Sequence, residues 1–291
     1  IITLGCESVL NRSEMENAEL YAVHNSMQRR DTEKALAEFM PKFTWSDDEM
    51  ILDVGCGPGD VTAEVLYPHL PSSANLVGVD INSKMVEYAN KKYSSKSIDF
   101  KQLDFSTKNI TNVFPERTFS KLFSFYCLHW IQDQQQTAKN IRSMLQPGGQ
   151  FLILMSPKNA VFKVYRIMSQ MDKWKSYMED LDNFIPCFYN SADPCEEIKH
   201  VLTSQGLDVE MCEERLETVS FPNKKILMRS NEAVNPFVKR MSQDTREQFM
   251  TNFEQVVDEN QLLTETISGE ILIQNHLIVV YGQRPLVETT A

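Results

Sequence analysis

The chain has 291 residues, of which 42% are hydrophobic and 24% are charged, so it is long enough to bury a large core. The net charge of −11 opposes nonspecific attraction to phosphate backbones, and no dense basic run is interleaved with aromatic residues. We therefore expect a globular protein with no nucleic-acid partner. No apolar run reaches the ~20 residues that a membrane helix needs, and the chain start does not resemble a signal peptide, which predicts a soluble, cytoplasmic protein without a membrane span.

The first residues carry no recognisable element, and we expect residues 1–14 to be a tag or an extension. A plausible helix begins with the segment 15–21. Six cysteines are scattered along the chain without C-x-x-C or Cys/His spacing, which predicts reduced, mostly buried thiols and no metal site.

The most informative segment joins a short apolar strand, 50–54, to a helix through alternating glycines. Glycines let the backbone turn sharply and approach a ligand closely. Apolar residues then recur at helical spacing from Val61 until Pro68 ends the pattern. The N–H groups at the start of this helix are expected to attract a carboxylate or a phosphate.

The spacing of these glycines separates two classes of cofactor. A dinucleotide fingerprint is G-x-G-x-x-G, whereas here the third glycine comes one place early, and Asp60 would repel a pyrophosphate. The second predicted strand, 76–79, ends at Asp80, which lies 21 residues after Gly59 and could accept hydrogen bonds from both ribose hydroxyls. The pattern therefore favours an unphosphorylated nucleoside cofactor and weakens a nicotinamide dehydrogenase.

Strands and helices alternate through the rest of the first half, a pattern typical of a parallel sheet covered by helices. Asn82 and Ser83 are predicted to cap the helix after the second strand. The turn residues Pro147, Gly148 and Gly149 are predicted to separate the last helix from the strand that follows it. The further predicted elements are strands at 98–103, 119–125 and 151–155, a helix at 137–145, and two late strands at 207–221 and 276–282.

Two segments, 160–189 and 222–266, interrupt this alternation and both look helical, so we expect them to form a cap. The first is rich in large apolar side chains. Such residues pack an insertion against a domain, but together they also leave room for an elongated apolar ligand. They are Phe162, Tyr165, Met168, Met171, Trp174, Tyr177, Met178, Phe184 and Phe188.

The glycine turn together with Asp80 resembles motif I and the acidic loop of class I S-adenosylmethionine methyltransferases. Several further segments make the chain similar, over nearly its whole length, to the insect juvenile hormone acid methyltransferase family. They are residues 15–21, 28–31, 126–130, 173–180 and 233–237. The resemblance implies an α/β class I methyltransferase fold, a Rossmann-like, doubly wound seven-stranded sheet with a helical cap.

The same resemblance implies a single methyltransferase domain over residues 15–291. Its core would comprise residues 45–159, 191–221 and 267–285. The cap segments would be 160–190 and 222–266.

The resemblance also implies the reaction, transfer of a methyl group from S-adenosylmethionine to the carboxylate of juvenile hormone acid or farnesoic acid. A carboxylic acid is already ionised at pH 7, so the reaction needs no general base. Family positions place Gln28 and Trp130 on this carboxylate as neutral donors. His129 either donates to it or braces the loop.

Cofactor contacts are expected around the carboxyl ends of the strands. Asp104, at the end of the third strand, could accept from the amino group of adenine. Arg30 could neutralise the cofactor carboxylate or form an exposed ion pair, and Cys56 is expected to pack beneath the turn. The full predicted set is Asp53, Gly55, Cys56, Gly57, Gly59, Asp80, Ile81, Met85, Leu103, Asp104, Phe105, Ser124 and Phe125.

Two alternatives stay open at the level of sequence. A relative could esterify another lipophilic carboxylic acid, such as a fatty acid, and a noncatalytic relative could bind a hormone or a partner. The expected partner is a small lipophilic acid, and a homodimer is possible.

Overall fold

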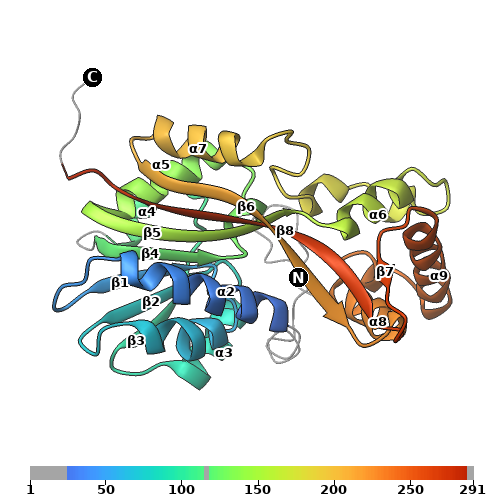
Figure 1. The fold of residues 1–291 in the computed structure, drawn as a ribbon, viewed down its shortest axis with the longest axis horizontal. Helices are drawn as coiled ribbons and strands as arrows, with labels where there is room; N and C mark the ends of the chain where they lie inside the picture. Colours follow the sequence, from blue (N-terminus) through green and yellow to red (C-terminus); the bar gives the residue numbers. More distant parts are fainter. Residues whose placement is uncertain (1–24, 115–117, 287–291) are drawn as a thin grey trace.

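The computed structural model describes residues 25–114 and 118–286. Figure 1 shows a twisted sheet with helices on both sides, and a smaller group of helices at the end where the long strands β6 and β8 extend beyond it. The strands are β1 (Met50–Val54), β2 (Asn75–Asp80), β3 (Ile98–Gln102), β4 (Phe119–Phe125), β5 (Leu145–Lys158), β6 (Asp208–Phe221), β7 (Thr264–Glu265) and β8 (Ile271–Gln283).

Eight α-helices occur in the described ranges, with shorter helical turns between them. The α-helices are α2 (Ser26–Phe39), α3 (Ser83–Tyr93), α4 (Ile110–Val113), α5 (Gln134–Met144), α6 (Ala160–Ser169), α7 (Pro194–Ser204), α8 (Lys224–Val234) and α9 (Gln243–Glu259). The short turns are η1 (Met40–Lys42), η2 (Thr62–Leu66), η3 (Tyr67–His69), η4 (Leu128–Trp130), η5 (Lys175–Tyr177), η6 (Leu181–Phe184) and η7 (Val238–Arg240).

The strand order is β3-β2-β1-β4-β5-β8-β6, and β7 pairs with β8 beside this path. Strands β1 to β5 pair in parallel, whereas β8 is antiparallel to both β5 and β6. The order reverses between β1 and β4. Open α/β sheets bind ligands at the carboxyl ends of the strands beside such a reversal, so the topology directs attention to the loops after β1 and β4.

Alternate residues of the strands explain the layers. In β1, Leu52 and Val54 pack with α4, α5 and α7, whereas Ile51 packs with α2 and η2 on the opposite face. Successive side chains of a strand point to opposite faces, so apolar residues throughout the strand bury both faces of the sheet. The predicted doubly wound α/β fold is confirmed.

The sheet has eight strands where seven were predicted, because the short strand β7 pairs with the early part of β8. β8 is also longer than predicted and begins at Ile271. A two-residue strand carries too little hydrophobic alternation to be found in a sequence.

One local prediction in the core was wrong. Strand β5 begins at Leu145 and includes Pro147 to Gly149, with Gly148 at φ +78°, so no separate turn precedes it. The predicted helix after β1 is present, and its middle, Thr62–Leu66, is a π-helix. Asn82 caps α3 as predicted, since its side chain accepts from the backbone N–H groups of Lys84 and Met85.

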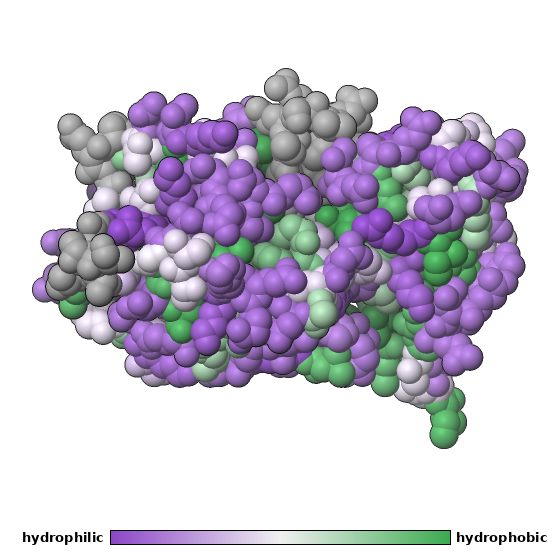
Figure 2. Space-filling view, turned by 90° about the horizontal axis from the view of Figure 1, so that it is seen from above, coloured by the Kyte–Doolittle hydropathy of each residue, from purple (hydrophilic) through white to green (hydrophobic). Residues whose placement is uncertain are grey.

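The cap has its own hydrophobic cluster, built on Trp174, Phe184, Phe237 and Phe249. Only residues 160–169 of its first segment are α-helical, and 3₁₀ turns follow, so the expectation of continuous helix was too simple. Figure 2 shows a mostly hydrophilic face on which hydrophobic residues gather toward the cap end. Within the described ranges, no helix is both long and apolar enough to cross a membrane.

Candidate active site

The glycine turn after β1 is held against β2 by backbone hydrogen bonds. The N–H groups of Gly55 and Cys56 donate to the Val79 carbonyl at 2.7 and 3.0 Å. Gly55, Gly57 and Gly59 all have positive φ, at 81°, 54° and 82°. Side chains disfavour this conformation, so the glycine spacing is a requirement of the backbone path.

Asp80, at the end of β2, is tied to the same turn. One carboxylate oxygen accepts from the Gly57 N–H at 3.0 Å, and the other accepts from the Asn82 N–H at 2.9 Å. Burial raises the pKa of Asp80, although these backbone donors oppose the shift. Each oxygen has capacity for a second donor, and hydroxyl groups of a ligand would favour the ionised form.

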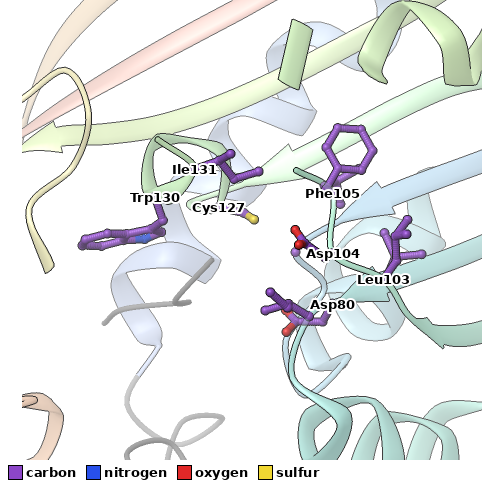
Figure 3. A pocket seen from close by; sticks show the side chains of 11 residues that line it. Asp80, Leu103, Asp104, Phe105, Cys127, Trp130 and Ile131 are labelled. Atoms are coloured by element: carbon purple, nitrogen blue, oxygen red, sulfur yellow. The ribbon is translucent and has the colours of Figure 1, made fainter. Parts of the chain in front are cut away.

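Figure 3 shows a cleft with Asp80 and residues 103–105 on one side and Cys127, Trp130 and Ile131 on the other. A buried carboxylate, apolar side chains and the Asp104 carboxylate meet along one wall. This set fits an adenosine group: Asp80 suits the ribose hydroxyls, and Leu103 and Ile131 suit the faces of a base. The Asp104 carboxylate already accepts from the backbone and hydroxyl of Ser106.

The structure brings six of the predicted cofactor residues into the lining of this cleft. They are Gly55, Asp80, Ile81, Leu103, Asp104 and Phe105. The other seven do not line it: the Ser124 hydroxyl donates to the Val54 carbonyl, and Phe125 packs with the cluster of α2. Met85 is buried, and Asp53 accepts from the Thr62 hydroxyl at 2.6 Å. Burial raises the pKa of Asp53 to about 7.

Cys56 is buried next to Gly57, and burial raises its pKa well above the usual value. The thiol is therefore protonated at neutral pH, which suits packing and does not suit a nucleophile. No group of three metal-ligating side chains occurs within residues 25–114 and 118–286.

A second, larger cavity of about 360 Å³ lies between the core and the cap. Its apolar walls come mainly from α6, α8 and the ends of β6 and β8, and include Phe162, Tyr165, Leu227 and Ile273. The volume lies within the range of small-molecule sites. Trp130 lines both this cavity and the cleft beside the glycine turn, so the two spaces meet at this residue.

Gln28, His129 and Trp130, the three predicted substrate contacts, line the larger cavity together. They are 4%, 2% and 4% exposed, and the Gln28 amide oxygen, the His129 Nδ1 and the Trp130 Nε1 have no hydrogen-bond partner among the described residues. Buried polar atoms almost always have partners. These atoms mark this end of the cavity as the place where a polar ligand group could bind.

His129 is uncharged in this setting, since burial lowers its pKa to about 3. The backbone explains how the pair is presented: Tyr126 has φ +58°, and the 3₁₀ turn η4 follows, with the Trp130 N–H bonded to the Cys127 carbonyl. The His129 and Trp130 rings lie 4.8 Å apart.

Tyr126 and Asp31 were not among the predicted site residues. The Tyr126 hydroxyl, which belongs to the cavity lining, donates to the buried Asp31 carboxylate at 2.6 Å. Asp31 lies three residues after Gln28 in α2, on the same face of the helix. In the sequence, the hint was a polar residue three positions after Gln28 with an arginine beside it. A solvent-exposed helix face shows the same pattern, so this hint does not identify a site.

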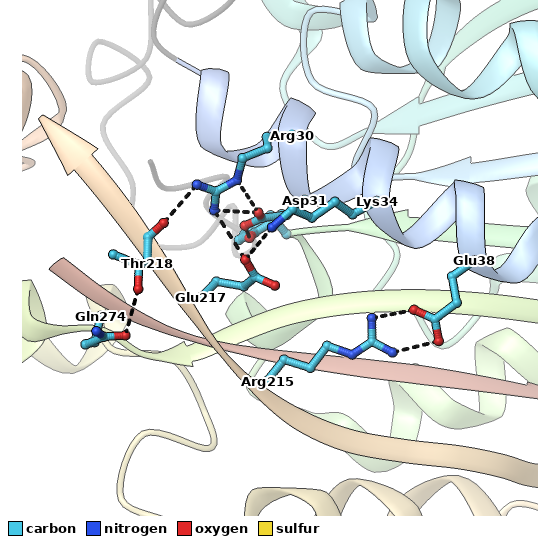
Figure 4. Close-up of polar contacts among 9 residues, drawn as sticks. Arg30, Asp31, Lys34, Glu38, Arg215, Glu217, Thr218 and Gln274 are labelled. Atoms are coloured by element: carbon cyan, nitrogen blue, oxygen red, sulfur yellow. Dashed lines mark hydrogen bonds and ion pairs between the residues drawn. The ribbon is translucent and has the colours of Figure 1, made fainter. Parts of the chain in front are cut away.

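Arg30 is committed to protein contacts. Figure 4 shows its guanidinium bridging Asp31 and the end of β6, where it donates to the Thr218 carbonyl and approaches Glu217. Asp60 likewise accepts from Asn25 and Arg29. Of the two readings of Arg30, the structure shows the ion pair, and no contact toward the cleft.

Similarity to known proteins agrees with this geometry. A family model described as a methyltransferase domain matches residues 51–149, the segment that builds the glycine turn, Asp80 and the site loops. The juvenile hormone acid O-methyltransferase of Drosophila melanogaster is 36% identical over 247 residues, covering 84% of this chain and 83% of that protein. The enzyme of the same name from Bombyx mori is 34% identical over 252 residues, covering 86% and 88%.

Solved structures show the same fold at much lower identity. The YcgJ protein of Bacillus subtilis matches with a TM-score of 0.54 at 16% identity, over 87% of this chain and 98% of that one. The phosphoethanolamine N-methyltransferase 2 of Haemonchus contortus, solved with S-adenosylhomocysteine, matches with a TM-score of 0.51 at 15% identity, over 95% and 61%. The protein is an S-adenosylmethionine-dependent methyltransferase, and its chain belongs to the juvenile hormone acid O-methyltransferase family.

Proposed function

We propose that this protein methylates the carboxylate of juvenile hormone acid or farnesoic acid and so forms the methyl ester. One observation carries the proposal: an apolar cavity of about 360 Å³ meets the cofactor cleft at Trp130, and neutral polar groups line the same cavity. A long apolar chain fits such walls, and its acid group needs the polar ones. The relatives from Drosophila melanogaster and Bombyx mori bear the name of this activity.

When bound, S-adenosylmethionine supplies a methyl group on a positively charged sulfur. The protein's own contribution is to hold the acid in line with that methyl group, which lowers the orientational entropy cost. The Gln28 amide and the Trp130 indole donate to the carboxylate without a full charge. A neutral donor orients an oxygen but leaves it more nucleophilic than an arginine ion pair would.

Exclusion of water is the second contribution. Gln28, His129 and Trp130 are nearly inaccessible to solvent, so the carboxylate loses most of its hydration shell on entering. No proton has to be removed from the acceptor, because the acid is ionised before it binds. The low pKa of His129, about 3, agrees with this, because so weak a base is poorly suited to remove a proton.

We propose the same division of the chain as the sequence predicted, with residues 160–190 and 222–266 acting as a cap over the acid. The separate cap cluster and the cavity beneath it support this division. A cytoplasmic location and a homodimer stay predictions, to be tested by cell fractionation and sedimentation.

The decisive test is a product assay with S-adenosylmethionine and a panel of farnesoic acid, epoxide-bearing juvenile hormone acid and straight-chain fatty acids. We expect equal amounts of S-adenosylhomocysteine and a methyl ester of one or both sesquiterpenoid acids. Absence of any ester would refute the proposal. If only the fatty acids form esters, the proposed class of substrate is wrong.

Substitutions at Gln28 and Asp80 test which part of the site binds the acid and which part binds the cofactor. Gln28→Ala should cut turnover while binding of S-adenosylhomocysteine stays close to wild type, because Gln28 lines only the acid cavity. Asp80→Ala should mainly weaken cofactor binding, measured by calorimetry. Gln28→Glu, which keeps the shape but adds a charge, should be at least as poor as Gln28→Ala. Wild-type turnover in Gln28→Ala would show that its proposed role is wrong.

A further inference from the structure

A polar pair, Ser156 and Asn275, lines the cavity opposite the predicted donors. Asn275 is only 1% exposed, and its amide oxygen accepts from the Ser156 hydroxyl at 2.7 Å. Its Nδ2 forms no hydrogen bond of normal geometry with the described residues, although it lies near enough to the Tyr126 hydroxyl to act on it. A buried amide N–H without an acceptor costs free energy unless a ligand supplies one.

The fold places this pair by a break in strand pairing. The register between β5 and β8 shifts between Met155 and Lys158, so Ser156 lies in an irregular stretch beside Asn275. Such irregularities redirect side chains near active sites. The bond from Ser156 occupies the amide oxygen, so the Asn275 Nδ2 is the end of the amide that Ser156 does not hold.

The neighbours of Asn275 identify the end of the cavity at which it lies. One N–H of the Asn275 amide faces the Tyr126 hydroxyl: burial and the Asp31 carboxylate raise the pKa of Tyr126 well above its usual value, and this N–H opposes the rise. The amide nitrogen carries a second N–H, which is the donor left for a ligand. Tyr126 is bonded to Asp31, one helical turn from Gln28. Asn275 therefore lies at the polar end.

The residues of strand β8 also show which end of the cavity is apolar and which is polar. Ile273 precedes Asn275 by two residues, lies on the same face of the strand and lines the cavity as well. Figure 1 shows β8 running from the cap toward the core sheet. The wall thus changes from apolar at Ile273, on the cap side, to polar at Asn275, on the core side.

We propose that Asn275 binds the substrate carboxylate through Nδ2 and holds the oxygen that does not receive the methyl group, while Ser156 is a positioning residue that fixes the amide. The assignment rests on the proposed function, because it requires an acid in the cavity. An ionised carboxylate has about four acceptor sites for two oxygens. Gln28 and Trp130 together leave room for a further donor, and a neutral amide avoids trapping the charge.

The test compares Asn275→Leu, which keeps the size and removes the donor, with the wild type in the full-length protein. We expect the KM for farnesoic acid to rise about tenfold to a hundredfold, the range for a hydrogen bond to a charged group. Affinity for S-adenosylhomocysteine should stay close to wild type. Asn275→Asp should be worse still, because it adds a like charge.

Asn231→Leu is the matched control. Asn231 lines the same cavity, but its Nδ2 already donates to the Leu227 carbonyl at 3.1 Å. The KM of Asn231→Leu for farnesoic acid should therefore change less than that of Asn275→Leu. Ser156→Ala should raise the KM by less than Asn275→Leu does, and Ser156→Thr, which keeps the hydroxyl, should restore it. Rescue by threonine separates positioning from simple packing.

The outcomes distinguish the two proposals. A wild type that forms no ester overturns the proposed function and this assignment with it. An active wild type with an unchanged KM in both Asn275→Leu and Ser156→Ala overturns the assignment alone. A KM that rises only for epoxide-bearing acids would place the donor at the epoxide and would also overturn it. If Asn275→Leu fails to fold, Ser156→Ala and Ser156→Thr carry the test.

Discussion

Trp130 is the residue at which the two halves of the site meet. Trp130 lines both the cleft of the glycine turn and the acid cavity, and its indole packs edge-on against Phe162 of the cap with ring centroids 5.7 Å apart. One side chain thus contacts the cofactor side, the acid side and the cap. The sequence predicted Trp130 as a donor, but its place between two cavities required the structure.

His129 yields a prediction about stability and pH. Its pKa is about 3 in the folded protein and about 6.5 in an unfolded chain. The stability that the neutral ring contributes is therefore present above pH 6.5 and is lost as the pH falls toward 3. Between pH 7.5 and pH 5 this single group should lower the free energy of unfolding by roughly 2 kcal/mol.

Urea unfolding at the two pH values checks this, with His129→Gln as the test variant. The variant should lose less stability than the wild type on acidification. His69→Gln, at an exposed position, is the matched control. Equal pH dependence of the wild type and His129→Gln would contradict a buried neutral ring.

At the level of elements, the glycine turn and the loop after β4 constrain each other. A Cβ atom at Gly55 would lie 2.2 Å from the Cβ of Cys127, which precedes the η4 turn carrying His129 and Trp130. The sequence explained this glycine by ligand approach. The structure adds a second reason, since the loop of another strand occupies the space of a side chain.

Gly55→Ala should therefore lose more stability than a positive φ alone explains. Gly269 has almost the same φ, +83°, but nothing lies within 4 Å of its Cβ position, so Gly269→Ala measures backbone strain by itself. We expect Gly55→Ala to cost about 1–3 kcal/mol more, from overpacking, and to weaken binding of S-adenosylhomocysteine. Similar losses in both variants would show that Cys127 moves away freely.

At the scale of the whole molecule, the core and the cap are built on different hydrophobic clusters. Trp174 is fully buried in the cap, with its indole bonded to Asn252 at 3.0 Å and its ring 5.2 Å from Phe249. None of these contacts involves the glycine turn or Asp80. A substitution that destabilises the cap should therefore weaken binding of the acid more than binding of the cofactor.

Trp174→Ala tests this independence. Removal of a buried tryptophan costs about 3–5 kcal/mol, which should loosen the cap and raise the KM for the acid. Titration with S-adenosylhomocysteine should give an affinity close to wild type. Trp174→Phe retains the ring contact and should have a smaller effect. Equal losses of acid and cofactor binding would mean that core and cap fold as one cooperative unit.

The sequence by itself indicated the fold class and a nucleoside cofactor, and its resemblance to known proteins added the methyl donor and the family. The fold class and the cofactor class depend on local patterns: apolar runs of strand length, glycines that a tight turn requires, and an acid at a fixed distance along the chain. It also supplied Gln28, His129 and Trp130 through the resemblance. Local patterns did not predict features that depend on pairing between strands. Examples are the short strand β7 and the early start of β5.

Only the tertiary structure decided which polar groups share the cavity. Asp31 and Tyr126 are 95 residues apart, and Ser156 and Asn275 are 119 apart, yet each pair forms a buried hydrogen bond. The sequence offers no period or spacing that links such residues, because their contact arises from helix docking on the sheet and from a register shift between two strands. A buried amide with an N–H left for a ligand, on which the role of Asn275 rests, is a property of the packed molecule alone.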